Sequence, residues 1–412
     1  MTEKNTPSKK LNRILAGLLT VAFLGFVFAA FFTMVIQHRG ELIHSVQMTP
    51  ALKKTLPQNA DKLDRLSARI NSFTSAISEN MWLKDEMGYV NSGFQYALGK
   101  RVINTGSQNM ITLTDGHLYD LADYRSLREN ALDIVALRNE TVGDIPFLFT
   151  YEHPTLYDDA MMPAGYEALD HSAQMADEAI ATLWENGVRV LDSRDVLPGS
   201  GYDLNDLLMV TDQHWSTLAA ITMAQAIAGE LNAMTGAALD PALLDRANLN
   251  TLVHERLFMG KYGQRVGTGL VTPDDIVEYW PKYDTHLSRD SKRSKLEESV
   301  EGDWRSVMTR SDRLEPEAGK TWNTYAYTYY GQIEAYDILS NPAAPDFTVL
   351  LLKDSYSAPI GRFLSLLARN VVCVDLRQDV EPLERWIERY RPDAVVMAYS
   401  LQMLRDDEYK FE

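Results

Sequence analysis

The chain has 412 residues, 45% of them hydrophobic and 24% charged, which is enough apolar material for a globular core and too much for a disordered tail. Its 40 basic and 57 acidic side chains leave a net charge of −17, which argues against a nucleic-acid partner because phosphate binding requires clustered Lys and Arg. The single cysteine, Cys373, excludes an intramolecular disulfide and a cysteine-rich zinc site.

An uncharged stretch near the N-terminus predicts a transmembrane helix. Residues 14–36 contain no charged side chain, and a helix of that length covers about 35 Å against about 30 Å of bilayer hydrocarbon. Four cations precede the stretch, at Lys4, Lys9, Lys10 and Arg13, and only Arg39 follows it closely. The positive-inside rule therefore predicts a single-pass protein of the cell membrane, with residues 1–13 in the cytoplasm and the main domain outside. A cleaved signal peptide is the alternative, since the two alanines at 29 and 30 resemble a cleavage site.

A polar juxtamembrane segment follows, and it contains one apolar helical stripe. Residues 37–80 carry this stripe at 3-4-3-4 spacing, on Leu63, Leu66, Ile70, Phe73 and Ile77. The spacing predicts a stalk helix, which either packs on its own domain or pairs with a second copy. Residues 81–412 show no internal repeat and are expected to form one domain.

Five short apolar runs predict the strands of that domain. They lie at 145–150, 188–191, 347–352, 371–376 and 394–398, and amphipathic helical segments separate several of them. Continuous apolar runs indicate strands buried on both faces, and alternation with helices indicates a parallel sheet. We therefore expect an α/β domain of three layers with a mostly parallel sheet. Residues 255–345 are rich in Gly, Tyr, Asp and Arg, and are expected to be an irregular insertion that walls a cleft.

The segment TDQHWST, residues 211–217, is the first candidate for chemistry. It lies between an apolar run and an amphipathic helix that Ser216 or Thr217 could cap. Residues two apart in a turn can face the same site, so Asp212 could accept the Nδ1 proton of His214 and leave Nε2 free as a base, with Trp215 shielding one side. The alternative is a capping Asp beside a histidine that packs on its own helix.

The segment LLLKDSYS, residues 350–357, is the second candidate. It predicts a strand that turns into a helix, which places the hydroxyl of Ser355 at the carboxyl end of the sheet. Backbone N–H groups near Ser355 and Tyr356 could hold an oxyanion there. A simple helix cap is the alternative. The presence of Ser, His and Asp at strand ends, where α/β proteins place their ligands, favours a catalytic site.

These two segments, with VVCVDLR at 371–377 and MGKYGQRVG at 259–267, resemble the DHHW-protein family, which is related to the SGNH-hydrolase-like domains of alginate O-acetylation proteins. The resemblance covers most of residues 81–412 and implies an SGNH-like fold. It also implies roles for three residues: Ser355 as nucleophile, His214 as general base and Asp212 as the acid that orients it. Family members act on exported polysaccharides and typically receive the acyl group from a membrane-bound O-acyltransferase, and no cofactor is implied.

The sequence thus predicts a membrane-anchored O-acyltransferase or acetylesterase that acts on an envelope or secreted glycan. Tyr356, Trp215, Arg265 and His153 are the expected substrate contacts. A glycan-binding or scaffolding protein that keeps the fold without turnover is the second hypothesis. A metal-dependent hydrolase is a third, but it would need ligands beyond Asp212 and His214, and only His153 or His254 could approach. The acidic composition slightly favours a neutral glycan over an acidic one.

Overall fold

The computed structural model describes residues 62–79, 84–104, 109–153, 161–293, 296–331, 334–378 and 380–405, with scattered residues between 17 and 40. The predicted cytoplasmic tail, parts of the predicted anchor at 14–36 and much of the juxtamembrane segment lie outside the described residues. Among the residues described, no helix combines the length and the apolar character that crossing a bilayer requires. The chain divides into two compact units, Met1–Asn91 and Ser92–Glu412.

In the first unit, helix α4 spans Lys62–Glu79, where the apolar stripe predicts the stalk helix. Two of its stripe residues, Leu66 and Ile70, are 54% and 53% exposed. The next helix, α5, runs from Lys84 to Ala97 and crosses the boundary between the units. Pairing of the stripe with a second copy stays a prediction.

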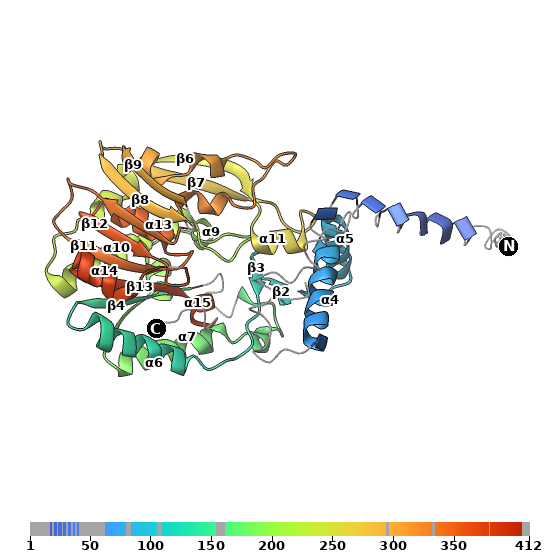
Figure 1. Cartoon of the computed structure of the whole chain (residues 1–412), viewed down its shortest axis with the longest axis horizontal. Helices are drawn as coiled ribbons and strands as arrows, with labels where there is room; N and C mark the ends of the chain where they lie inside the picture. The colour runs from blue at the N-terminus through green and yellow to red at the C-terminus, as the bar shows by residue number, and fades with distance from the viewer. Residues whose placement is uncertain are drawn as a thin grey trace. The chain divides into compact units, whose positions relative to one another are not determined.

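The second unit is built on a sheet of eight strands in the order β5-β4-β13-β11-β12-β10-β8-β9 (Figure 1). The first five strands are parallel to one another. They are β4 (Phe147–Glu152), β5 (Arg189–Asp192), β11 (Thr348–Lys353), β12 (Asn370–Val374) and β13 (Ala394–Ser400). Each coincides with one of the five predicted apolar runs to within a few residues, so these predictions are confirmed.

Three antiparallel strands extend this parallel half: β10 (Tyr336–Ser340), β8 (Leu287–Arg293) and β9 (Leu296–Gly302). The sheet is therefore mixed, and residues 255–345 are more regular than their composition predicts. The reason is that β8 and β9 are rich in charged side chains, and β9 is a largely exposed edge strand. Such strands lack the apolar run by which the buried strands were found.

Helices cover both faces of the sheet, which gives the three predicted layers. Helices α10 (Thr217–Thr235) and α13 (Ala358–Leu364) pack on the face to which Val349 and Leu351 point. Leu350 and Leu352 point to the opposite face, which is covered by α6 (Arg128–Leu137), α7 (Ser172–Glu185) and α14 (Leu383–Tyr390). Neighbouring residues of β11 are thus buried on opposite faces, because side chains alternate along a strand.

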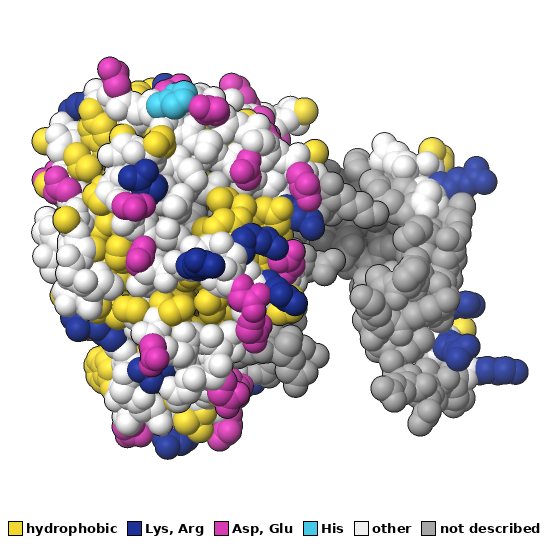
Figure 2. All heavy atoms as spheres, turned by 60° about the vertical axis from the view of Figure 1, so that its left-hand side comes forward, with side chains coloured by type: hydrophobic (Ala, Val, Ile, Leu, Met, Phe, Trp, Pro, Cys, Tyr) yellow, Lys and Arg dark blue, Asp and Glu magenta, His cyan; other side chains and the backbone are white. Residues whose placement is uncertain are grey.

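Smaller elements complete the unit. A three-stranded sheet contains β1 (Val102–Asn104), β2 (Asn109–Thr112) and β3 (Leu118–Asp120), and a separate hairpin contains β6 (Leu249–Phe258) and β7 (Asp274–Pro281). The short helices are α8 (Ser193–Gly199), α9 (Leu204–Leu207), α11 (Lys261–Val266), α12 (Trp304–Met308) and α15 (Leu401–Arg405). On the face shown in Figure 2, acidic and basic side chains are interspersed, with hydrophobic side chains between them.

Candidate active site

The residues Asp212 and His214 lie in a tight loop just before α10. An isolated bridge between Leu208 and Trp215 closes this loop. Ser216 then caps the helix, because its side chain accepts a hydrogen bond from the backbone N–H of Ala219. Ser216, one of the two residues that the sequence indicates as a cap, is therefore the helix cap. Asp212 does not cap the helix and contacts His214 instead.

Asp212, His214 and Ser355 form a continuous hydrogen-bonded chain. The Nδ1 atom of His214 is 2.5 Å from Oδ1 of Asp212, and its Nε2 atom is 2.8 Å from Oγ of Ser355. The backbone N–H of His214 also donates to the same Asp212 oxygen, at 3.0 Å. The fold thus brings together two segments that lie 141 residues apart in the chain.

Ser355 sits in the turn between β11 and α13, and a set of local hydrogen bonds shapes this turn. The Asp354 carboxylate accepts from the backbone N–H groups of Tyr356, at 2.8 Å, and of Ser357, at 3.4 Å. The hydroxyl of Ser357 in return accepts from the N–H of Asp354. Among residues 349–368, only Ser355 is not buried. The turn therefore presents the Ser355 side chain while enclosing its neighbours.

The charges that flank Ser355 are both satisfied within the protein. The second oxygen of the Asp354 carboxylate accepts from the backbone N–H and the hydroxyl of Ser400, at 2.9 and 2.7 Å. Lys353 is fully buried and donates from Nζ to the backbone carbonyl of Glu334. Because hydrogen bonds to the charged form stabilise a carboxylate, these donors offset the negative charge that Asp354 places next to the serine.

Two tyrosine rings clamp the imidazole of His214. Tyr327 stacks on it with ring centroids 4.5 Å apart, and Tyr356 packs at 4.6 Å. Burial raises the pKa of Tyr327 to about 12, so this ring is neutral near pH 7. Sequence reasoning placed Tyr327 only among the aromatic residues of the expected insertion. No local signal could reveal that it reaches His214, because the contact depends on the folding of a remote segment.

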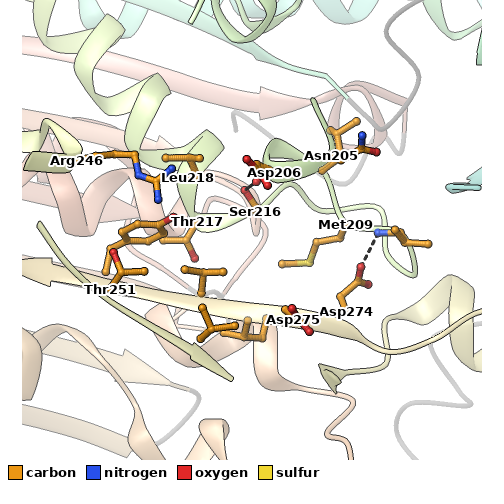
Figure 3. Close-up of a pocket in the computed structure, with 16 residues that line it drawn as sticks. Asn205, Asp206, Met209, Ser216, Thr217, Leu218, Arg246, Thr251, Asp274 and Asp275 are labelled. Atoms are coloured by element: carbon orange, nitrogen blue, oxygen red, sulfur yellow. Dashed lines mark hydrogen bonds between the residues drawn. The ribbon is translucent and has the colours of Figure 1, made fainter. Parts of the chain in front are cut away.

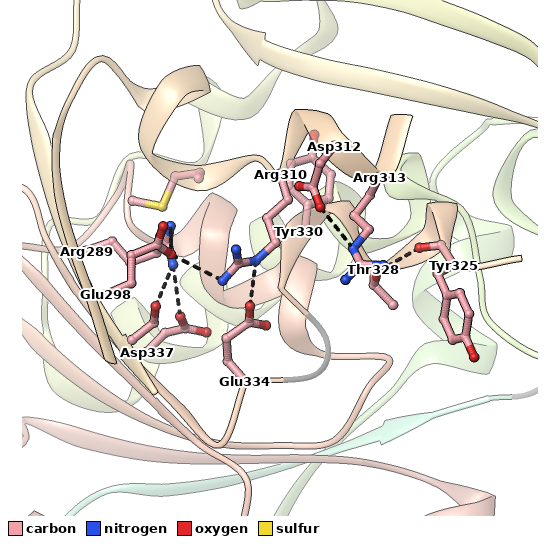
Figure 4. A network of polar contacts seen from close by, with 12 residues as sticks. Arg289, Glu298, Arg310, Asp312, Arg313, Tyr325, Thr328, Tyr330, Glu334 and Asp337 are labelled. Atoms are coloured by element: carbon pink, nitrogen blue, oxygen red, sulfur yellow. Dashed lines mark hydrogen bonds and ion pairs between the residues drawn. The ribbon is translucent and has the colours of Figure 1, made fainter. Parts of the chain in front are cut away.

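The segment that carries Tyr327 is held by buried ion pairs (Figure 4). Arg310 donates from its backbone N–H to the carbonyl of Tyr329, and from Nε to Glu334 at 2.7 Å. Arg362 donates from Nε to the carbonyl of Tyr330 and pairs with Asp337 at 2.9 Å. These contacts anchor the turn of residues Ala326–Tyr330 from behind, and thereby fix the position of the ring over His214.

The motif MGKYG supplies the support behind Asp212. The backbone N–H of Lys261 donates to Oδ2 of Asp212 at 2.7 Å, and the N–H of Gly260 donates to the hydroxyl of Thr211 at 2.8 Å. A Cβ atom at Gly260 would lie 2.3 Å from Cβ of Asp212. In the structure, α11 begins here and its first turn holds the carboxylate.

The environment of Asp212 keeps its carboxylate ionised. Burial opposes the charge, but the attraction of His214 and the hydrogen bonds from His214 and the Lys261 N–H outweigh it, so the pKa of Asp212 is lowered from its ordinary value. An ionised Asp212 accepts the Nδ1 proton of His214, which leaves Nε2 available to the Ser355 hydroxyl.

Two of the four predicted substrate contacts, Trp215 and Tyr356, line the small cavity beside Ser355. Trp215 and Tyr356 are only 4% and 3% exposed. Trp215 donates from Nε1 to the carbonyl of Tyr356, and Tyr356 donates from Oη to the carbonyl of Gln213. These hydrogen bonds brace the loop, and the two nearly buried rings also form part of the wall of that cavity.

The other two predicted contacts lie elsewhere in the fold. His153 is 4% exposed just after β4, and strand β13 lies between β4 and the strand that leads to Ser355. Arg265 lies in α11, close enough to Asp120 to oppose the effect of burial, which raises the pKa of that carboxyl to about 6. Within the described part of the chain, no group of three or more His, Cys, Asp or Glu residues is arranged to hold a metal ion.

A buried glutamate lies behind the serine turn. Glu152 ends β4 opposite Ser400, is 0% exposed, and lies beside the Asp354 carboxylate, with which it can form a hydrogen bond only when one of the two carboxyls is protonated. Burial, and then the negative charge of Asp354, raise the pKa of Glu152 well above its ordinary value of 4.5. The folded protein therefore keeps the proton on this carboxyl to a higher pH than the unfolded chain, which ionises it above about pH 4.5.

Replacing Glu152 by Gln is consequently expected to make the protein more stable at neutral pH. Wild type and E152Q should differ least below pH 4, where the glutamate is protonated in both states. The advantage of the variant should then grow by about 1.4 kcal/mol per pH unit until the raised pKa is reached. Urea unfolding between pH 4 and 8 measures this, with the exposed Glu140 changed to Gln as the control. A stability difference that shrinks as the pH rises would contradict the assignment.

Comparison with known proteins supports the fold. Residues 154–296 match the family model described as the SGNH hydrolase-like domain of the acetyltransferase AlgX. A DHHW family protein from Eubacterium siraeum has the same fold, with a TM-score of 0.56, 16% identity, and coverage of 74% of this chain and 94% of that chain. Bacillus cereus PatB1, whose structure was solved with a sulfonyl adduct, gives a TM-score of 0.58 at 16% identity. The match covers 75% of this chain and 100% of PatB1 in that structure. No curated protein matches the chain in sequence.

The chain thus has an α/β fold with a mixed sheet, and residues 154–296 are similar to SGNH hydrolase-like domains. The resemblance expected from the sequence is confirmed, since the chain carries an AlgX-type SGNH hydrolase-like segment and has the fold of a DHHW family protein.

Proposed function

We propose that this protein is a serine-dependent O-acetyltransferase that modifies hydroxyl groups of an envelope or secreted polysaccharide. The observation that carries the proposal is the hydrogen-bonded chain from Asp212 through His214 to Ser355. The match of residues 154–296 to the acetyltransferase AlgX family model supports acyl transfer as the reaction. A cavity of about 10 Å³ beside Ser355, lined by Met209, Tyr330 and Pro359 among others, supports a small acyl group. It has room for about one water-sized group, as an acetyl methyl would need.

In the first step, Oγ of Ser355 attacks the carbonyl carbon of the acyl donor while Nε2 of His214 takes the hydroxyl proton. A new C–O bond forms, and the carbonyl oxygen becomes a transient oxyanion. Sequence reasoning offered the N–H groups near Ser355 and Tyr356 as its donors. The Tyr356 N–H is engaged by Asp354, which leaves the Ser355 N–H to stabilise the oxyanion. The bond to the donor's leaving group then breaks, and His214 returns the proton to that group.

In the second step, a glycan hydroxyl gives its proton to Nε2 of His214 and attacks the acyl-serine carbon. The ester bond to Ser355 breaks, His214 reprotonates Oγ, and the acetylated glycan leaves. Throughout both steps Asp212 keeps the Nδ1 proton on the imidazole and stabilises the imidazolium. Attack by water in place of the glycan would make the protein an acetylesterase.

The proposal includes attachment to the cell membrane through residues 14–36. The length of this uncharged stretch and the cations before it support an anchor whose catalytic domain faces away from the cytoplasm. A membrane-bound O-acyltransferase is the proposed source of the acyl group, because an anchored domain would meet such a donor at the bilayer surface.

Serine-directed labelling tests the proposal. Full-length protein in detergent is treated with a fluorophosphonate or a sulfonyl fluoride, and the modified peptide is read by mass spectrometry. We expect a mass increase at Ser355 that is absent from S355A and reduced by at least about 10³-fold in rate in H214A. The exposed Ser311 reports non-specific labelling. A folded protein that is not labelled, or H214A labelled at the wild-type rate, would favour the glycan-binding alternative.

A further inference from the structure

A second, larger pocket lies beside the site, between the first turn of α10 and the β6–β7 hairpin (Figure 3). Its volume is about 350 Å³, at the small end of the range of about 300 to 1,000 Å³ for small-molecule sites. Exposed side chains surround its mouth: Asn205, Asp206, Arg246, Thr251 and Asp275. The pocket is thus open to solvent and large enough for a sugar ring with its substituents.

This pocket adjoins the cavity at Ser355. Met209 and Thr217 line both spaces, so these two side chains form the wall between them. The hydroxyl of Thr217 is 2.5 Å from Oη of Tyr329, which fixes the wall to the segment that carries Tyr327. The two spaces are therefore separated by a wall of side chains that includes Met209 and Thr217.

The lining of the pocket has the chemistry of a sugar site. Its floor is made of buried apolar side chains, including Leu218 and Ile276, together with Tyr279, and can cover the C–H face of a pyranose ring. The rim offers carboxylates and an amide, which accept hydrogen bonds from hydroxyl groups. Two carboxylates are already partly committed: Asp274 accepts from the backbone N–H groups of Val210 and Thr211, and Oδ1 of Asp275 accepts from the N–H of Arg256.

The charge of the rim discriminates between kinds of sugar. Asp206 and Asp275 face the pocket with a single cation, Arg246, while Asp274 adds a third acidic group to the wall. Arg246 also lies over the rings of Tyr202 and Tyr279, with its guanidinium carbon 5.8 and 5.9 Å from the ring centroids. A uronate carboxylate in this pocket would be repelled, whereas an uncharged sugar would not.

We propose that this pocket binds a sugar unit without a carboxylate, next to the unit that is acetylated, and so selects neutral glycans over uronate polymers. The proposal rests on the proposed function for its role in acetyl transfer, but the binding itself can be measured without turnover. Its substrate class differs from that of an acidic polysaccharide such as alginate, because the acidic groups at the rim outnumber the one arginine.

Titration calorimetry with full-length S355A protein tests the pocket, using cellopentaose and chitopentaose as neutral probes and pentagalacturonate as the anionic one. We expect at least one neutral probe to bind at least about tenfold more tightly than pentagalacturonate. T251W fills the pocket from β6 and should weaken that binding at least tenfold. L252W is the matched control, because Leu252 is the next residue, is 42% exposed, and is not among the pocket-lining side chains.

The double variant D206N/D275N removes two acidic groups from the rim. It should therefore reduce the ratio of the affinity for the neutral probe to the affinity for pentagalacturonate. Any of three results would overturn the proposal. Pentagalacturonate could bind the S355A protein as tightly as the neutral probes or more tightly, neither neutral probe could bind, or T251W could bind the neutral probe as tightly as L252W does. The outcome is separable from that of the labelling experiment. If T251W abolishes binding of the neutral probe but Ser355 of the wild-type protein is not labelled, the proposed sugar site is supported and the proposed acetyltransferase activity is rejected.

Discussion

Replacing Asp212 by Asn is expected to slow the reaction of Ser355 with an acyl or sulfonyl probe by about 10⁴-fold, the size of the loss seen when a serine protease loses the charge of its aspartate. The two oxygens of Asp212 accept from different donors, the His214 ring and the Lys261 N–H. An amide has only one oxygen. If that oxygen faces Lys261, the NH₂ group faces Nδ1 of His214 and forces the proton onto Nε2, where it blocks the base.

The opposite orientation of the amide is no better. Its NH₂ group would then face the buried Lys261 N–H, and a buried donor left unpaired costs about 1–3 kcal/mol. Stopped-flow or gel-based rates with a fluorophosphonate, at several pH values, measure the loss. The control is D115N, since Asp115 contacts His117 with the same two-residue spacing and a 3.0 Å distance from Oδ2 to Nδ1. Comparable loss in D115N would mean that the effect is structural and does not arise at Ser355.

Replacing Gly260 by Ala is expected to destabilise the protein by about 3 kcal/mol, at the upper end of overpacking costs, and to slow labelling of Ser355 as well. The added Cβ would lie 2.3 Å from Cβ of Asp212 and 2.5 Å from the carbonyl oxygen of Thr211. Neither atom can move freely, since Asp212 bonds to His214 and the Thr211 carbonyl accepts from the N–H of Gly263. Relief of the clash must therefore displace the carboxylate or the first turn of α11.

Thermal unfolding and labelling rates of G260A, compared with G269A, test this second prediction. Gly269 is a matched control because a Cβ there meets nothing within 4 Å and the backbone φ is not positive. We expect G269A to remain within about 0.5 kcal/mol of wild type. A G260A protein that is as stable and as rapidly labelled as G269A would show that the tight contact between Gly260 and Asp212 does not exist in solution.

Local patterns in the sequence were sufficient for the parallel half of the sheet and for the candidate triad. The run at 347–352 is continuous because β11 is buried on both faces, so burial alone produces the pattern. Asp212 and His214 are close in the chain, and their contact follows from the geometry of a single turn. Ser355 could be placed because a strand that leads into a helix positions a serine at the edge of the sheet.

Contacts between remote segments could not be predicted in this way. The stacking of Tyr327 on His214 and the bond from the Lys261 N–H to Asp212 each join segments about 50 or more residues apart. Trp215 and Tyr356 were expected to contact substrate, and only the tertiary packing shows that both are nearly buried in the wall of the small cavity beside Ser355.

Strand burial and turn geometry are local properties, so the residues alone predict the parallel half of the sheet and the three residues that form the hydrogen-bonded chain. The extension of the sheet by β8, β9 and β10, the two tyrosine rings packed on the imidazole, and the acidic-rimmed pocket next to the cavity at Ser355 are visible only in the folded chain. These features depend on contacts between segments that are far apart in the sequence, and the local pattern of each segment does not indicate which other segment it contacts.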